Sequence, residues 1–301
     1  MGYGSYTSSD WSKLKSSRKI TSSSSEANIF EKKSMDPKFD PKYIACREAR
    51  DSDDHPDSTP IILGLDVTGS MGYLSSKIAK EGLHETMMKL FSTKPINDPQ
   101  IMFAAIGDVV DRAPLQVTQF ESDIRIAQQL LDLWLEGSGG DWEEDYPLLW
   151  YFAAKHTAAD RFEKRHQKGY LFTIGDADCH SSISQENIAE IFRDNIFKNN
   201  DTDYTASELA KMAKENYELF HINIGTSSGK LTNFNRAIPG RILNIPKENI
   251  DSLPELIVSV LMLFQGRSMA DVLECWPKQV SAVVARSVKN LVVTSESGVS
   301  F

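Results

Sequence analysis

The residues best suited to chemistry form a short run in which polar side chains stand at alternate positions. Asp66, Thr68 and Ser70 occupy every second position between Leu65 and Met71. A carboxylate and two hydroxyls at this spacing let a loop wrap a small, hard cation such as Mg²⁺, which prefers oxygen ligands. The competing interpretation is a helix N-terminus that is capped by Ser and Thr, with Asp66 merely favourable near the helix dipole. The three residues alone leave both interpretations open.

Two apolar runs predict strands that bring a second carboxylate to the same place. Residues 61–65 and 170–174 are short, continuous apolar segments, which are typical of buried parallel strands. Asp66 follows the first run directly, and Asp176 follows the second. Open α/β sheets bind ligands beyond the carboxyl ends of their strands. We therefore expect Asp66 and Asp176 to lie at one edge of a sheet.

A glycine-rich segment, residues 136–145, lies between these two strands in the sequence and is full of oxygen ligands. We expect this loop to reach the same edge, with Ser138 and Asp141 as further candidate ligands. Trp142 and Glu143 in the same loop are candidates for contact with a partner protein, since exposed aromatic residues commonly anchor interfaces.

Asp108 also follows a predicted strand, residues 101–106. It is a candidate to hydrogen bond to the metal ligands and orient them without contacting the ion itself. An ordinary loop carboxylate is the alternative interpretation.

The surrounding pattern predicts the elements that position these residues. From Pro60 onward, strand-like runs alternate with segments of helical periodicity over roughly 200 residues, which predicts one doubly wound, mostly parallel, Rossmann-like α/β sheet with helices on both faces. Further strands are predicted at 116–120, 219–224 and 241–245, and helices at 75–91, 124–134, 146–156 and 251–264. Residues 280–293 are predicted to form either a strand or a helix.

The composition divides the chain into three parts. Residues 1–57 are rich first in Ser and then in Pro and Asp, and we expect them to form a flexible tail and linker. An arm that lies on the domain surface is the alternative for the Pro- and Asp-rich part, where Phe39, Tyr43 and Ile44 offer apolar contacts. Residues 58–266 carry the α/β pattern, and residues 267–301 are expected to form a C-terminal extension.

Asp-x-Thr-x-Ser-Met after the first strand, a Gly-Gly loop in mid-domain and a later strand followed by Gly-Asp together resemble a von Willebrand factor A (vWA) domain with its metal-ion-dependent adhesion site. The resemblance covers roughly residues 60–266 and is greatest to intracellular prokaryotic and phage members of the family. It implies that Thr68 and Ser70 coordinate Mg²⁺ through their hydroxyls and that Asp66 and Asp176 act mostly through bound water. It also implies one open coordination position for a partner's carboxylate.

One position departs from the family pattern. The family usually supplies a Thr directly after the Gly-Gly pair, whereas Asp141 follows Gly140 here. Asp141 or Ser138 is expected to substitute for the missing Thr. A carboxylate there would make the surroundings of the ion more negative, so Mn²⁺ and Ca²⁺ are alternatives to Mg²⁺.

Charge and cysteine content restrict the partners and the compartment. The formal net charge is -9 and the pI about 5.3, which argues against nucleic acid as the main partner. The three cysteines are widely spaced, which is typical of a reducing compartment, and no apolar run is long enough to cross a bilayer. These features predict a cytoplasmic protein that binds neither nucleic acid nor membrane.

Three catalytic interpretations are disfavoured. Cys179 and His180 are neighbours in the sequence, and neighbours rarely form a productive nucleophile and base. Residues 225–231 mimic a phosphate-binding loop but are one residue short between the glycines. A haloacid-dehalogenase-type phosphatase would need an Asp two positions after Asp66, where Thr68 stands.

Two functional hypotheses follow. The first is a non-enzymatic, metal-dependent interaction module that binds an Asp or Glu of a partner protein. By family analogy the partner is an AAA+ ATPase or another subunit of a multi-protein assembly. The second is a metal-dependent hydrolase of phosphate esters that uses the acidic loop to activate water.

Overall fold

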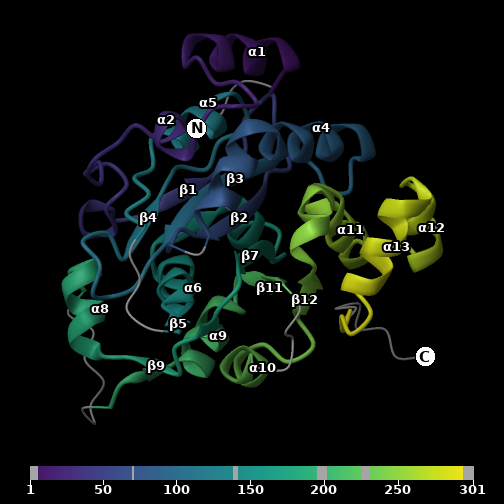
Figure 1. The fold of residues 1–301 in the computed structure, drawn as a ribbon. Coiled ribbons are helices and arrows are strands. Elements are labelled where there is room, and N and C mark those ends of the chain that lie inside the picture. Colours follow the sequence, from purple (N-terminus) through teal and green to yellow (C-terminus); the bar gives the residue numbers. More distant parts are fainter. Residues whose placement is uncertain (1–5, 70, 138–141, 195–201, 226–230, 294–301) are drawn as a thin grey trace, which may run out of the picture.

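The computed structural model describes residues 6–69, 71–137, 142–194, 202–225 and 231–293. A six-stranded sheet forms its centre, in the order β12-β11-β7-β2-β3-β4 (Figure 1). The strands are β2 (Thr59–Asp66), β3 (Pro99–Ile106), β4 (Leu115–Val117), β7 (Gly169–Gly175), β11 (Tyr217–Ile224) and β12 (Ile242–Ile245).

All neighbouring strands in this sheet pair in parallel, except that β4 pairs antiparallel with β3 at one edge. The chain runs from β2 outward through β3 to β4 and then returns to β7 on the other side of β2. The strand order therefore reverses between β2 and β7. This reversal point, at the carboxyl ends of the two strands, is where an open α/β sheet binds ligands.

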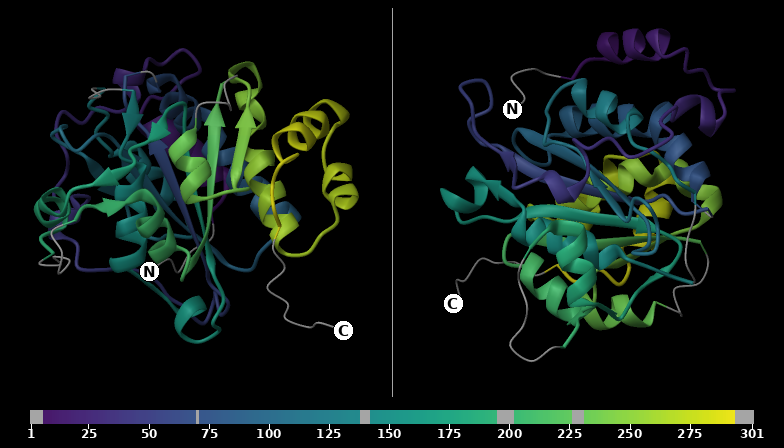
Figure 2. Two further views of the ribbon diagram at one scale, coloured as in Figure 1. Left: turned by 90° about the horizontal axis from the view of Figure 1, so that it is seen from below. Right: turned by 90° about the vertical axis from the view of Figure 1, so that its left-hand side faces the viewer.

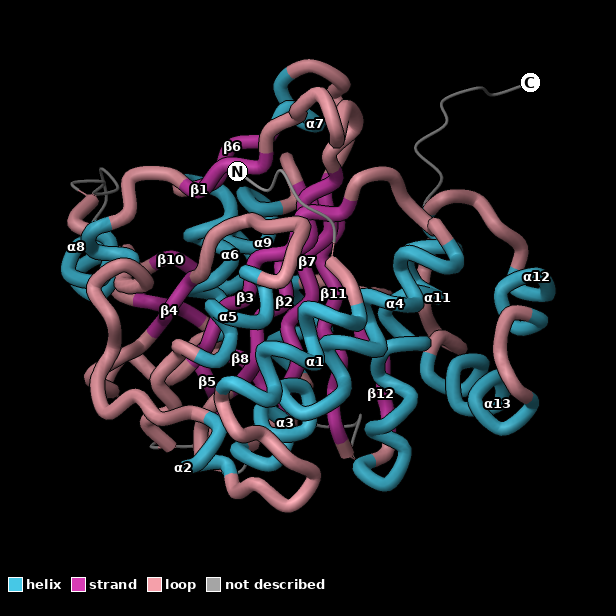
Figure 3. Tube along the Cα trace, turned by 90° about the horizontal axis from the view of Figure 1, so that it is seen from above, coloured by secondary structure: helices cyan, strands magenta, loops and turns pink. Residues whose placement is uncertain are grey.

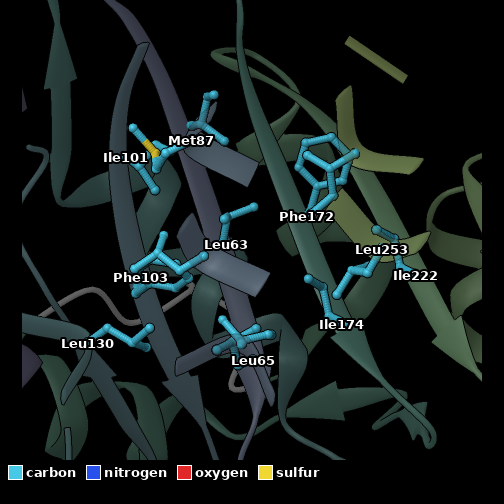
Figure 4. Packing of buried hydrophobic residues seen from close by; sticks show 14 of the residues in the cluster. Leu63, Leu65, Met87, Ile101, Phe103, Leu130, Phe172, Ile174, Ile222 and Leu253 are labelled. Atoms are coloured by element: carbon cyan, nitrogen blue, oxygen red, sulfur yellow. The ribbon is translucent and has the colours of Figure 1, made fainter. Parts of the chain in front are cut away.

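Helices cover both faces of the sheet, as predicted for a doubly wound fold. Alternate residues of β2 pack on opposite sides: Leu63 and Leu65 join one apolar core and Ile62 joins the other. Figure 4 shows Leu63 and Leu65 of β2 beside Phe103 of β3, with Met87 from one covering helix nearby. Every residue of β2 and β3 is buried, which explains why their sequences read as continuous apolar runs.

The first core contains α4 (Leu83–Thr93), α5 (Arg125–Leu131) and α11 (Leu253–Phe264), and the second contains α6 (Tyr146–Lys155), α8 (Gln185–Phe192), α9 (Ala206–Ala213) and α10 (Thr232–Ala237). The helix predicted at 75–91 is present but is divided into α3 (Gly72–Lys77), a π-helical turn η2 (Ile78–Gly82) and α4. The sequence pattern did not reveal this π turn, because apolar spacing changes little across one wider turn.

The N-terminal segment differs from the expectation of a flexible tail from residue 6 onward. It forms α1 (Ser8–Ser17), α2 (Glu26–Ile29), the 3₁₀ turn η1 (Pro41–Tyr43) and the strand β1 (Arg47–Ala49). Several of its apolar residues, including Trp11, Ile29 and Phe39, are almost fully buried, whereas Tyr43 is exposed. Trp11 stacks on His84 of α4 at a centroid distance of 5.9 Å, and Figures 1 and 3 show α1 over the helical layer. The composition favoured a flexible tail because the apolar residues of this segment are few; the docked arm was the alternative for its Pro- and Asp-rich part.

Strand β1 pairs in parallel with β6 (Thr157–Ala159), so the arm is joined to the domain by backbone hydrogen bonds. After α11, the chain forms α12 (Met269–Glu274) and α13 (Lys278–Ser287), which lie beside the β12 side of the sheet (Figure 2). Residues 278–287 are thus helical, which decides between the two alternatives predicted for this region.

Further short elements are α7 (Asp160–Glu163), the 3₁₀ turn η4 (Lys247–Ser252) and an antiparallel pair of β9 (Ser182–Ile183) with β10 (Tyr204–Thr205). Across the part of the chain that the structure describes, every helix is too short or too polar to span a lipid bilayer.

Candidate metal centre

Asp66 is the last residue of β2 and is completely buried at the carboxyl end of the sheet. Its Oδ1 accepts a hydrogen bond of 2.9 Å from the backbone N–H of Thr68 and one of 2.6 Å from the Thr68 hydroxyl. The loop after β2 therefore folds back over the carboxylate. Asp66 and Thr68 form a single unit, as expected from their spacing.

The other oxygen of this carboxylate is held by a residue that the sequence did not single out. The hydroxyl of Tyr146, at the start of α6, donates a 2.9 Å hydrogen bond to Asp66 Oδ2. Tyr146 is fully buried and contacts His221 edge to face. Gly175, at the end of β7, makes this contact feasible: a Cβ there would lie 1.8 Å from the Tyr146 hydroxyl and 2.8 Å from Asp66 Oδ2.

Burial raises the pKa of the Asp66 carboxyl to about 6, although the hydrogen bonds from Thr68 and Tyr146 favour its ionised form. The negative charge of Asp176, which follows Gly175, adds to the rise. Asp176 itself is exposed. The structure thus brings Asp66, Thr68 and Asp176 to one edge, with Asp176 on the solvent side.

A second buried carboxylate, Glu144, lies against this unit. Glu144 belongs to β5 (Glu143–Glu144), which pairs in parallel with β8 (Asp178–Cys179) and fixes the end of the glycine-rich loop. Its side chain is only 5% exposed and hydrogen bonds with Thr68. Burial, reinforced by the charge of Asp66, raises the pKa of Glu144 to about 9. Within the described residues, Glu144 Oε2 has no hydrogen-bond partner.

Three of the predicted ligands, Ser70, Ser138 and Asp141, lie outside the described residues. The loops that carry them do approach each other, since a Cβ on Gly69 would lie 3.2 Å from the carbonyl oxygen of Gly137. Among the described residues of the glycine-rich loop, it is Glu144 that meets Thr68.

The two predicted partner-binding residues differ in exposure. Trp142 is 92% exposed, next to the buried Glu144. Glu143 is partly buried, and its Oε1 accepts a 3.1 Å hydrogen bond from the side chain of Asn233. Trp142 is thus open to a partner, whereas Glu143 is engaged within the fold.

The side chains of Asp178 and Cys179 are engaged or buried within the fold. The Asp178 carboxylate accepts hydrogen bonds from the backbone N–H groups of Asn233 and Phe234, in the first turn of α10. Burial raises the pKa of the Cys179 thiol far above its usual range, so it stays protonated. A nucleophile needs the thiolate, and this location therefore disfavours catalysis by Cys179.

Asp108 lies at the same edge, after β3, and is 3% exposed. Its Oδ1 accepts a hydrogen bond of 3.3 Å from the backbone of Val110, and its Oδ2 lies 3.7 Å from His180 Nε2. The next carboxylate after Glu144, Asp145, accepts a hydrogen bond of 2.7 Å from the backbone of Val109. Asp108 is therefore adjacent to the loop that carries Glu144.

The donor set around Asp66 fits a hard divalent cation. The described groups, Asp66, Thr68, Glu144 and Asp176, offer only oxygen atoms, which Mg²⁺, Mn²⁺ and Ca²⁺ prefer. Two buried carboxylates that repel each other, one with an unpartnered oxygen, are costly without a compensating positive charge. A cation would supply that charge.

Sequence reasoning missed Glu144 and Tyr146 as members of this site. The loop holds five carboxylates between residues 136 and 145, and nothing in their order tells which one turns inward. The pairing of β5 with β8 determines that the Glu144 side chain is the one that points inward. Tyr146 reads in the sequence as an ordinary apolar residue of a helix.

Comparison with known proteins gives a likeness of fold. No family model matches the sequence, and a search of curated proteins finds no match. Among solved structures, the pilus adhesin SpaC from Lactobacillus rhamnosus GG matches with a TM-score of 0.46 and 10% identity over 72% of this chain and 32% of that one. A von Willebrand factor type A protein from Catenulispora acidiphila matches with a TM-score of 0.41 and 13% identity over 71% of this chain and 44% of its own.

Proximal thread matrix protein 1 from the mussel byssus, in a structure with a zinc-occupied metal-ion-dependent adhesion site, matches with a TM-score of 0.43 and 12% identity. The match covers 73% of this chain and 49% of that one. This chain therefore spans between about a third and a half of the length of these three proteins.

Proposed function

We propose that the carboxyl edge of the sheet binds a divalent cation, Mg²⁺ in the first instance, and presents it to a partner protein. Asp66, Thr68, Glu144 and Asp176 would hold the ion, directly or through water. The observation that carries the proposal is the presence of two buried carboxyl groups at this edge: Asp66, which accepts a 2.6 Å hydrogen bond from the Thr68 hydroxyl, and Glu144, whose Oε2 has no hydrogen-bond partner among the described residues.

The ion would supply one coordination position for an oxygen of the partner, such as an Asp or Glu carboxylate. Asp176 is exposed at this edge, and Trp142 offers an apolar contact surface at the end of the same loop as Glu144. An exposed aromatic residue beside a charged centre is a common anchor of protein interfaces. The partner would belong to a multi-protein assembly, with an AAA+ ATPase as one candidate by family analogy.

The charge of the buried ligand Glu144 affects how strongly the bound ion attracts a partner's carboxylate. Three carboxylates around a divalent ion leave a net negative centre, which weakens the attraction of a further carboxylate. Glu144→Thr would keep an oxygen ligand and remove one negative charge. We therefore expect this variant to bind acidic ligands more tightly while binding the ion itself more weakly.

The metal can be tested with Mn²⁺, whose bound water molecules speed the relaxation of solvent protons. We expect the wild-type chain to bind Mn²⁺ with retained water, and Mg²⁺ to compete for the site. Asp66→Asn should remove this binding, whereas Asp54→Asn, a change of an exposed carboxylate in the N-terminal segment, should not. Equal Mn²⁺ binding by both variants would contradict the metal site.

The partner interaction needs a separate measurement. A set of peptides that differ only in one Asp, Asn or Ala is titrated against the Mn²⁺-loaded chain, and displacement of bound water is followed. Displacement by the Asp peptide alone supports a carboxylate ligand. Equal behaviour of the three peptides would overturn the acidic-ligand proposal and leave the metal site standing.

The alternative role, hydrolysis of phosphate esters, is distinguished by turnover. Mg²⁺-dependent cleavage of a generic phosphodiester that is lost in Asp176→Ala would support the enzyme. No turnover in the Mg²⁺-loaded protein would favour the interaction module.

A further inference from the structure

Beside the Asp66 unit, three side chains from separate elements converge on a small space. Asp108 comes from the segment after β3, Asp145 from the residue before α6, and His180 from the residue after β8. Each offers one ligand atom, and these atoms all lie within 4.8 Å of one another. None of the three belongs to the proposed Asp66 site, which consists of Asp66, Thr68, Glu144 and Asp176.

The burial of this trio is unusual for charged groups. Asp108 is 3% exposed and Asp145 is 2% exposed, so water does little to screen their charges from each other. Buried carboxylates in mutual contact are found where a proton or a metal ion neutralises them.

The distance between His180 and Asp108 fits a shared ion better than a direct hydrogen bond, whereas the carboxyl groups of Asp108 and Asp145 contact each other directly. His180 Nε2 and Asp108 Oδ2 are 3.7 Å apart, which is too long for a hydrogen bond. Two ligands of one transition-metal ion, each at about 2.0–2.2 Å from it, lie roughly 3–4 Å apart. The separation of these two atoms therefore fits a shared ion.

The backbone of His180 is fixed next to the loop that carries Glu144, and its imidazole Nδ1 lies 3.8 Å from Glu143 Oε2. The backbone N–H of His180 donates a 3.1 Å hydrogen bond to the carbonyl of Glu144, which continues the β5–β8 pairing. The fold thus holds the imidazole near the carboxylates of Asp108 and Glu143.

Glu144, described above at the Asp66 site, also lies near this trio. It precedes Asp145 in the chain and lies close enough to Asp66 and Asp108 for both charges to act on it. Its Oε2 is buried and has no hydrogen-bond partner within the described residues. A buried carboxylate oxygen without a donor is costly unless a positive charge faces it.

We propose that Asp108, Asp145 and His180 form a second divalent-metal site, with Glu144 between it and the Asp66 site. The imidazole nitrogen selects Zn²⁺ or Co²⁺ over Mg²⁺ and Mn²⁺, which prefer oxygen ligands. The second ion would join the segments after β3 and β8 to the start of α6. It would thereby fix the end of the loop that delivers Glu144 to Thr68.

The test uses the full chain, depleted of metal with a chelator and then dialysed against Zn²⁺ in the presence of excess Mg²⁺. We expect one equivalent of bound Zn²⁺. His180→Ala should weaken Zn²⁺ binding by more than about 100-fold, beyond the effect of losing a residue that only supports a ligand. His166→Ala, which removes an exposed histidine from the opposite edge of the sheet, should leave binding unchanged.

X-ray absorption at the zinc edge identifies the ligands without relying on affinity. We expect one imidazole and an oxygen shell in the wild type. A shell of oxygen alone, or no retained Zn²⁺ in the wild-type chain, would overturn the proposal.

Asp66→Asn separates the second site from the first. This variant should lose Mn²⁺ binding at the Asp66 site yet keep Zn²⁺. Loss of Zn²⁺ in Asp66→Asn, or equal Zn²⁺ affinity in His180→Ala and His166→Ala, would contradict an independent second site. A circular dichroism spectrum of each variant, matched to the wild type, confirms that the fold is intact.

Discussion

Carboxyl groups lie at both ends of the central sheet, but their pKa values are shifted in opposite directions. At the amino end, Asp51 accepts hydrogen bonds from Arg165 Nη1 and Nη2 and from the Ser58 hydroxyl. These partners hold the pKa of Asp51 at about 2, although burial opposes them. At the carboxyl end, burial raises the pKa of Asp66 to about 6 and that of Glu144 to about 9.

The same residue type therefore stabilises the fold at one end and strains it at the other. Guanidinium groups compensate the carboxylates of the amino end within the protein itself. At the carboxyl end, Asp66 and Glu144 have no such partner among the described residues, so a proton or a bound cation must neutralise them. This difference supports the proposal that the carboxyl end binds a cation, since perturbed pKa values cluster at binding sites.

The largest effect on stability is expected from Gly175→Ala, which disrupts the close packing at the carboxyl end of the sheet. The new Cβ would lie 1.8 Å from the Tyr146 hydroxyl, so Tyr146 or β7 must move. We expect a loss of more than about 4 kcal/mol in the free energy of unfolding, measured in urea. The control is Gly82→Ala, whose Cβ would meet its neighbours at 3.6 Å or more and should stabilise by up to about 1 kcal/mol.

The dependence of stability on pH should have opposite signs at the two ends. A carboxyl whose pKa is raised by folding stabilises the folded state below its unfolded pKa, near 4, and loses this contribution as pH rises through its folded pKa. In chelator, the free energy of unfolding should thus fall between pH 5 and pH 9. The shift of Asp66 alone corresponds to roughly 3 kcal/mol.

Asp51 acts in the other direction: its contribution is present above pH 4 and is lost as pH falls towards 2. Saturating Mg²⁺ should flatten the decline on the alkaline side and leave the acid side unchanged. A decline between pH 5 and pH 9 that is equally steep with and without Mg²⁺ would show that no cation neutralises the carboxyl end.

A matched pair of substitutions sharpens the comparison. Asp51→Asn removes an ion pair and is expected to cost about 2 kcal/mol at pH 7. Asp66→Asn removes a charge that is unfavourable without metal, so in chelator it should stay within about 1 kcal/mol of the wild type. If both variants lose the same stability in chelator, the two ends do not differ as described.

The smallest effect on stability is expected from Trp142→Ala. This side chain is 92% exposed, so its removal should change the free energy of unfolding by less than about 0.5 kcal/mol. Mn²⁺ binding should also be unchanged, whereas binding of a protein partner should weaken. A substantial loss of stability would show that Trp142 packs on the domain rather than facing a partner.

Much of the fold was predictable because the strands are buried on both faces. Continuous apolar runs such as 61–65 and 170–174 predicted β2 and β7, and the residues after them predicted where Asp66 and Asp176 meet. Helices α8 and α9 were missed, since each is only 8 residues long and carries few large apolar side chains: Ile188, Ile191 and Phe192 in α8, and Leu209 and Met212 in α9.

The candidate site was predictable only where local sequence decides geometry. Asp66 and Thr68 contact each other across two positions, and their spacing shows it. Tyr146 reaches Asp66 across 80 positions, and Glu144 is oriented by a strand 35 positions away in the chain. Such contacts depend on tertiary packing, which the sequence pattern does not reveal.

The short parallel pair of β1 and β6 has a consequence for the order of folding. Arg50, just after β1, contacts Asp160 across 110 positions of the chain. Closing so long a loop is entropically costly, and β6 has no fixed place until the central strands and α6 have assembled. We expect the N-terminal arm to dock last and to open first. Its amide hydrogens should therefore exchange with solvent well before those of β2 and β7.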